Sequence, residues 1–119
     1  MSGLTKIKPP KKVRIGLYSA GLNTYWGQFE GLYDCLMGYN RFIEKRLSEW
    51  GEVFNFGMVD TEEKGREAGE FFNKNNVDIV FSHAATYYAS ATVLPVHQIN
   101  NAPVIIFNHS LRDALFHIL

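Results

Sequence analysis

The sequence predicts an α/β protein with an open parallel sheet of about four strands, in the order 2-1-3-4, and helices on both faces. Short, nearly continuous apolar runs recur along the chain, as in strands that are buried on both faces of a parallel sheet. Segments with apolar spacing of three and four, typical of helices, separate these runs. Such alternation implies right-handed crossovers between parallel strands. The 119 residues, 46% of them apolar, are enough for one core.

The first strand is predicted at residues 13–20 (VRIGLYSA), and a long helix follows it. Asn23 or Thr24 would cap this helix, which runs to residue 49 or bends near residues 38–40. Its apolar positions fall on one face, formed by Tyr25, Phe29, Leu32, Tyr33, Leu36, Tyr39, Ile43, Leu47 and Trp50.

The remaining strands are predicted at residues 52–59, 77–82 and 103–108. A helix opened by Asp60 or Thr61 follows the second strand, with two glutamates in its first turn, where carboxylates favour the positive helix end.

A further helix is predicted at residues 86–100, between the third and fourth strands. Because proline breaks a helix interior, Pro95 should kink this helix or make it begin near Leu94. Ser110, with an aspartate three residues later, would begin a last helix.

The strand order 2-1-3-4 is that of flavodoxin-like and Rossmann-like folds, whose sheets usually contain more strands. The chain also stops on an apolar helix end at residues 116–119. Residues 1–12, which are basic and contain two prolines, are expected to be a flexible leader. We therefore expect residues 13–119 to be an incomplete domain, the front part of something larger.

The composition argues against nucleic acid and membranes as partners. Lysine plus arginine balances aspartate plus glutamate at 12 each, so no overall field gathers polyanions. No segment approaches the roughly 20 apolar residues that span a bilayer. Cys35 is the only cysteine, which fits a reducing compartment, and its place beside the apolar helix face predicts a core position. We expect a cytoplasmic protein.

A binding site is predicted where two connections meet. In open parallel sheets, ligands bind beyond the carboxyl ends of the strands, where the chain order reverses, here between the first and third strands. The two connections at that point, residues 19–28 and 82–90, are rich in aromatic, hydroxyl and amide side chains. Asn23, Thr24 and Gln28 could hydrogen-bond a polyol.

The aromatic side chains of the same connections would form the walls of this site. Tyr25 and Trp26 could stack on an apolar face of the ligand, with Tyr87 and Tyr88 opposite. The alternative for Tyr25 and Trp26 is that they only begin the buried face of the helix.

His83 and His109 each follow a strand and so lie at the same edge, but no carboxylate stands near either one and no zinc spacing is present. We expect satisfied or solvent-facing histidines at the edge of the site, and no metal. Phosphate-loop and dinucleotide motifs are also missing from the sequence. A flavodoxin-type phosphate loop finds a partial match at residues 19–24, which leaves an FMN carrier as an open alternative.

Residues 21–32 (GLNTYWGQFEGL), with Leu36, Gly38 and Tyr39 after them, resemble the G-L-D-T-Y-W-P-Q-F-x-G-L segment near the start of sugar isomerases of the L-arabinose isomerase and L-fucose isomerase type. Residues 78–96 (DIVFSHAATYYASATVLPV) are similar to the aromatic and hydroxyl loop that follows a strand in those enzymes. Asn23 replaces the aspartate of the family and Gly27 its proline. From residue 109 onward there is no match, so the ending is a truncation, a shifted reading frame or a separate small protein.

The resemblance implies the Rossmann-like amino-terminal domain of an oligomeric aldose–ketose isomerase. It assigns sugar contacts to Asn23, Tyr25, Trp26 and Gln28 in the first loop. The loop after the third strand, with Thr86, Tyr87 and Tyr88, would reach a neighbouring subunit's site.

In that family a divalent metal, usually manganese, is held by glutamates and histidines beyond this domain. We therefore expect a substrate-edge and oligomerisation module with no cofactor and no catalysis of its own. A stand-alone sugar-binding or regulatory module is the alternative.

Overall fold

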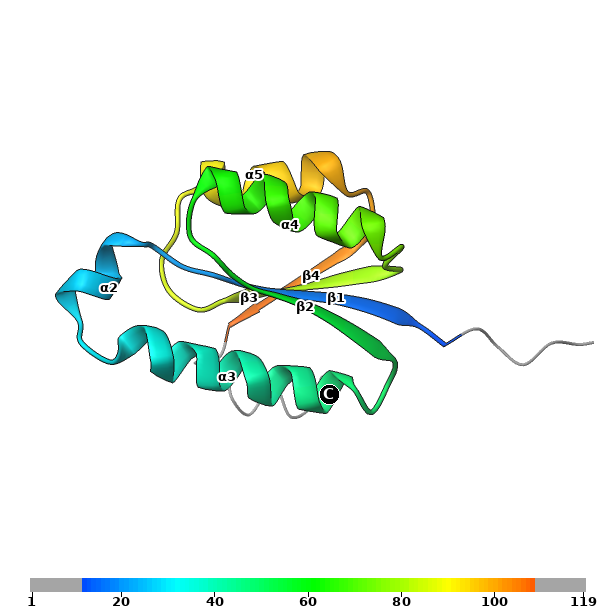
Figure 1. Ribbon diagram of the computed structural model, residues 1–119, viewed down its shortest axis with the longest axis horizontal. Coiled ribbons are helices and arrows are strands. Elements are labelled where there is room, and N and C mark those ends of the chain that lie inside the picture. Colours follow the sequence, from blue (N-terminus) through cyan, green and yellow to red (C-terminus); the bar gives the residue numbers. More distant parts are fainter. Residues whose placement is uncertain (1–11, 109–119) are drawn as a thin grey trace, which may run out of the picture.

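The computed structural model describes residues 12–108 and confirms the predicted α/β class, with a parallel sheet in the order β2-β1-β3-β4 and helices on both faces (Figure 1). The strands are β1 (Arg14–Ala20), β2 (Glu52–Val59), β3 (Ile79–Ala84) and β4 (Val104–Asn108). The helices are α2 (Thr24–Gln28), α3 (Leu32–Leu47), α4 (Glu62–Lys74) and α5 (Ser90–Ile99). His109 and the last predicted helix lie outside the described residues.

Both faces of the sheet are covered, which explains the continuous apolar run of β1. The face under α3 buries Ile15, Leu17, Ile43 and Leu47. The opposite face, under α4 and α5, buries a second cluster that includes Tyr18, Val59, Phe72, Val80 and Val96. Side chains alternate between these clusters along β1, so this strand is the centre of the core.

The predicted single helix over residues 24–49 is wrong, because α2 ends at Gln28 and α3 begins at Leu32. Gly31 lies between them at φ 81°, a left-handed backbone conformation that residues with a Cβ rarely adopt. The break turns α2 relative to α3, and Phe29 is 51% exposed although it continued the apolar spacing. Cys35, expected in the core, is exposed.

Pro95 lies inside α5, which begins at Ser90; the start near Leu94 is therefore wrong, as is a start at residue 86. The helix packs closely on α4, whose facing positions are small. A Cβ on Gly69 would lie 2.8 Å from Ile99 Cβ, and one on Gly65 would lie 3.6 Å from Pro95.

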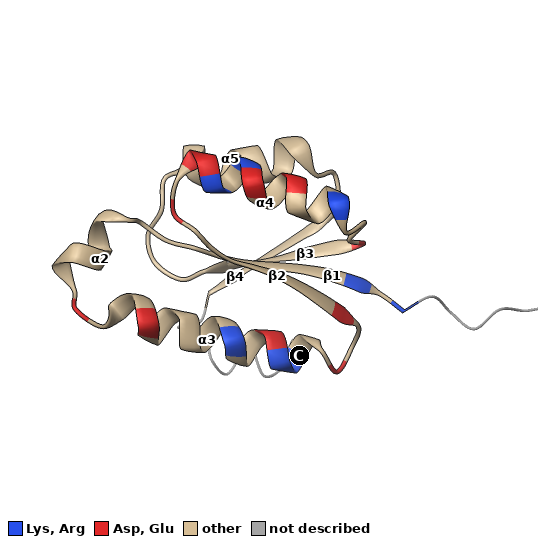
Figure 2. Ribbon diagram, viewed as in Figure 1, with Lys and Arg blue, Asp and Glu red and all other residues tan. Residues whose placement is uncertain are grey.

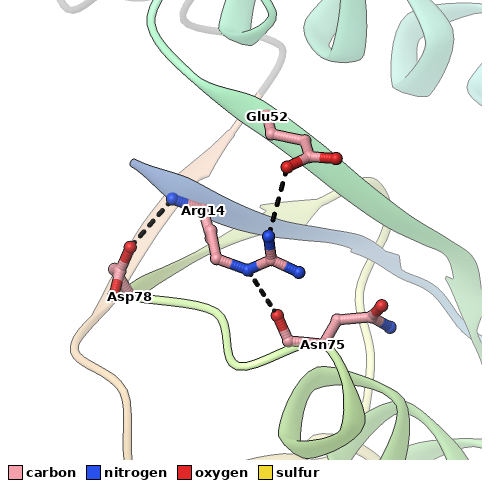
Figure 3. A network of polar contacts seen from close by, with 4 residues as sticks. All are labelled: Arg14, Glu52, Asn75 and Asp78. Carbon is pink, nitrogen blue, oxygen red and sulfur yellow. Dashed lines mark hydrogen bonds and ion pairs between the residues drawn. The ribbon is translucent and has the colours of Figure 1, made fainter. Parts of the chain in front are cut away.

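The amino ends of three strands are tied together by Arg14 (Figure 3). Its amide donates to Asp78 Oδ2 (2.9 Å), its Nε donates to the Asn75 carbonyl (2.7 Å), and its Nη1 contacts Glu52 Oε1 (3.2 Å). The guanidinium also lies 4.4 Å from the centre of the Phe54 ring. None of the helices within residues 12–108 combines the length and the apolar composition of a membrane span.

Candidate functional site

The connections that leave β1 and β3 meet at the carboxyl edge of the sheet. The amides of Ala85 and Thr86 both donate to the Ala20 carbonyl, at 3.0 and 3.3 Å. A Cβ on Gly21 would lie 2.9 Å from the Trp26 indole and 3.2 Å from Thr86 Oγ1. The predicted connections, residues 19–28 and 82–90, thus adjoin each other, and we call the part at the sheet edge, residues 20–29 and 84–90, the rim.

Thr86 joins the two halves of the rim through its hydroxyl. Oγ1 accepts from the Leu22 amide (3.0 Å) and donates to the Tyr87 carbonyl (2.9 Å). Because the hydroxyl proton is used within the protein, Thr86 holds the connections together rather than offering a donor to a ligand.

Trp26 is fixed between the rim and the core. Its Nε1–H donates to Asp60 Oδ2 (2.8 Å), and its ring packs edge to face on Tyr33, with centroids 5.1 Å apart. It also borders the buried cluster of Leu36, Met58 and Ala85. An indole has only this one donor, so Trp26 can present only its ring to a ligand.

The polar residues exposed on the rim are Asn23, Thr24, Gln28, Ser90 and Tyr87, the last of them 71% exposed. Among residues 12–108, the side-chain amides of Asn23 and Gln28 have no hydrogen-bond partner. Tyr25 is half-buried, edge to face with Phe29 at 5.7 Å. Tyr88 is half-buried too and packs on the core under α4 and α5.

The rim is electrically neutral. Residues 20–29 and 84–101 contain no lysine, arginine, aspartate or glutamate. Figure 2 shows the charged residues along α3 and α4 and at the strand ends, with none on α2 or α5. An uncharged ligand with hydroxyl groups suits this surface better than a phosphate.

Beneath the rim, a chain of hydrogen bonds crosses the sheet on the α3 face. Asn55 Nδ2 donates to Asn40 Oδ1 (2.6 Å), and Asn40 Nδ2 donates to Ser19 Oγ (2.8 Å). Ser19 Oγ lies 2.7 Å from His83 Nδ1, and the His83 ring stacks on Phe107 with centroids 5.5 Å apart. His83 is fully buried, so it supports the rim from below and does not contact a ligand.

A second polar group lies under α5 on the opposite face. The Tyr18 hydroxyl is 2.7 Å from His97 Nε2, and burial raises the pKa of Tyr18 to about 12. Burial also lowers the pKa of His97. Tyr18 therefore stays protonated and His97 neutral, and the two side chains share one hydrogen bond whose direction depends on the His97 tautomer.

Sequence reasoning missed Ser19, Asn40, Asp60 and the Tyr18–His97 pair. For Asp60 a signal was available, because it directly follows β2, whose carboxyl end adjoins that of β1. Within the described residues, no group of three histidine, cysteine, aspartate or glutamate side chains could hold a metal ion.

Comparison of the chain with protein-family models, with curated proteins and with solved structures gave no match.

Proposed function

We propose that the chain is the sugar-contacting amino-terminal domain of an aldose–ketose isomerase of the L-arabinose or L-fucose type. The observation that carries the proposal is the neutral rim, whose two connections carry two unpaired side-chain amides, an exposed phenol and a fixed indole. The residues that build half of this rim are those whose sequence resembles the sugar isomerases.

The chemistry of the rim fits a polyol. Amides both donate and accept, so Asn23 and Gln28 can pair with adjacent sugar hydroxyls. Tyr87 forms the second wall, and Trp26 supplies an apolar ring against sugar C–H groups. Thr86 holds the two connections together, while Tyr25 and Tyr88 contribute less because they are half-buried.

Hydrogen transfer between C1 and C2 of a sugar needs a base and an electrophile for the enediolate. The manganese site that the family would use does not fit the described residues, which contain no suitable ligand group. We therefore assign binding to this chain and the chemical steps to residues outside it. Purified chain with added Mn²⁺ should not convert L-arabinose or L-fucose.

An FMN carrier is less compatible with the same loop. Its phosphate site needs free backbone amides, whereas Gly21 N donates to the Val59 carbonyl (3.2 Å) and Leu22 N donates to Thr86 (3.0 Å). Absorbance in the flavin region after incubation with FMN and gel filtration would contradict our assignment.

The binding test is an NMR titration of ¹⁵N-labelled chain with L-arabinose and L-fucose. We expect weak, millimolar affinity, as for one half of a site, and a several-fold loss in Asn23→Ala and Gln28→Ala. Asn101→Ala and Gln98→Ala, exposed amides outside the rim, serve as matched controls and should bind like the parent. Equal losses in both pairs would refute the assignment.

Self-association is the second part of the proposal, and β4 supports it. Val104, Ile105 and Ile106 are 37%, 37% and 63% exposed, although a continuous apolar run is typical of a covered strand. β4 pairs only with β3 among the described strands, so its outer edge offers backbone groups to another chain.

A further inference from the structure

Asp60 is a buried carboxylate at the carboxyl edge of the sheet, directly after β2. Only 9% of the residue is exposed. Its Oδ2 accepts the Trp26 indole N–H at 2.8 Å, and its Oδ1 lies 3.3 Å from Lys64 Nζ. A carboxylate this deeply buried is costly unless it is paired and hydrogen-bonded. Trp26 supplies the hydrogen bond to Oδ2, and Lys64 pairs with Oδ1, which accepts no hydrogen bond within the described residues.

Helix capping does not explain this residue. Thr61, not Asp60, is the N-cap of α4, and its Oγ1 accepts the Lys64 amide at 3.1 Å. The side chain of Asp60 points instead toward the indole, which belongs to a segment 34 residues earlier in the chain. Its hydrogen bond therefore serves the rim, while its ion pair with Lys64 ties it to the first turn of α4.

The contacts of Trp26 leave the indole little freedom. Asp60 holds its nitrogen, Tyr33 packs on it at an interplanar angle of 82°, and the Gly21 backbone lies against its six-membered ring. Tyr33 and Gly21 limit the ring by shape alone. The hydrogen bond to Asp60 is the contact that fixes the direction of the ring plane.

We propose that Asp60 is a positioning residue that holds the Trp26 ring in place for the sugar, with Lys64 holding the carboxylate from the other side. The part that concerns sugar rests on the proposed function. The part that concerns the hydrogen bond between Asp60 and the indole does not rest on it, because this bond can be measured without any ligand.

The test uses the full chain in a Trp50→Phe background, which leaves Trp26 as the only tryptophan. Hydrogen exchange of the indole N–H is measured by NMR, and sugar affinity is measured in the same samples. In Asp60→Ala the indole N–H should exchange about tenfold faster, the effect of losing a hydrogen bond to a charged acceptor, and sugar affinity should fall several-fold.

Asp60→Asn keeps an acceptor and should be intermediate in both measurements, so it decides the question if Asp60→Ala does not fold. Lys64→Met leaves the carboxylate in place and should have a smaller effect of the same sign. Glu63→Gln, an exposed carboxylate in the same turn, is the matched control and should change neither quantity.

Unchanged indole exchange in Asp60→Ala and Asp60→Asn would overturn the proposal. Faster exchange with unchanged sugar affinity would overturn the positioning role, while faster exchange with reduced affinity supports it. If the parent chain binds no sugar, the proposed function fails, and indole exchange alone then decides whether Asp60 holds the ring.

Discussion

At the scale of single residues, the rim depends on close contacts that the sequence does not reveal. Apolar spacing left open whether Trp26 faces a ligand or the core. In the structure Trp26 is partly exposed, packs against a buried cluster and donates a hydrogen bond to Asp60. The hydroxyl of Thr86, whose loop is predicted to reach a neighbouring subunit's site, joins the two connections. Both contacts link distant segments, and local patterns contain no information on such pairs.

Gly21 provides the first prediction at this scale. Gly21→Ala would place a methyl group 2.9 Å from the indole, which cannot move without leaving Asp60. We expect the free energy of unfolding to fall by about 1–3 kcal/mol, the usual cost of overpacking, as measured by urea denaturation. Gly27→Ala, whose Cβ would meet nothing within 4 Å, is the control and should not destabilise the protein.

His97 provides a second prediction, on pH. Burial lowers the pKa of His97, so the folded state binds its proton less readily than the unfolded chain does. Below pH 6.5, the ordinary pKa of histidine, His97 should therefore lower the free energy of unfolding. This decrease should grow as the pH falls, until the pKa of His97 in the folded state is passed.

Urea unfolding of the parent and of His97→Gln between pH 5 and pH 8 checks this effect, since ~6.5 is the reference pKa of histidine. The variant should lose the His97 part of the pH dependence, and so show a shallower decline toward acid. The same dependence of unfolding free energy on pH in both proteins would show that His97 does not contribute to it.

At the scale of elements, the strands could be predicted from their apolar runs, and their order from the alternation of strands with helices, although β4 is mostly exposed. The boundary between α2 and α3 could not, since apolar spacing continues through the break and a glycine alone does not show its φ. Only the structure shows that Gly31 is left-handed, at φ 81°. The break matters for the site, because α2 is a short helix separate from α3, with exposed Asn23 at its N-cap and exposed Gln28 at its end.

Gly31→Ala should therefore destabilise the protein by about 1–2 kcal/mol, the cost of a left-handed conformation for a residue with a Cβ. Gly38→Ala, within α3 and with no atom within 4 Å of the added methyl group, should instead stabilise it by about 0.5–1 kcal/mol. Thermal or urea unfolding of the pair measures the contrast. Equal effects would mean that Gly31 is not under conformational constraint.

At the scale of the whole molecule, the central strand and the edge strand of the sheet differ in burial. β1 is buried on both faces, whereas β4 exposes its apolar side chains at the edge of the sheet. Such an edge usually carries charges or bulges that prevent pairing, and β4 contains no charged residue.

We accordingly expect the chain to self-associate through β4. Ile106→Lys places a charge on the most exposed strand residue and should shift sedimentation toward the monomer. Leu94→Lys, a similarly exposed apolar residue on α5 (51%), is the control and should sediment as the parent does. A parent chain that is monomeric at all concentrations would contradict this prediction.

The central claim is that a neutral sugar binds where the connections of β1 and β3 meet. The most direct measurement is an NMR titration of the ¹⁵N-labelled chain with L-arabinose and L-fucose, in which the chemical-shift changes of the amide and indole groups are mapped. We predict that saturable shifts cluster on the side chains of Asn23 and Gln28, the Trp26 indole and the Tyr87 amide. Saturable shifts at the opposite edge of the sheet, around Arg14, or no shifts at millimolar sugar, would contradict it.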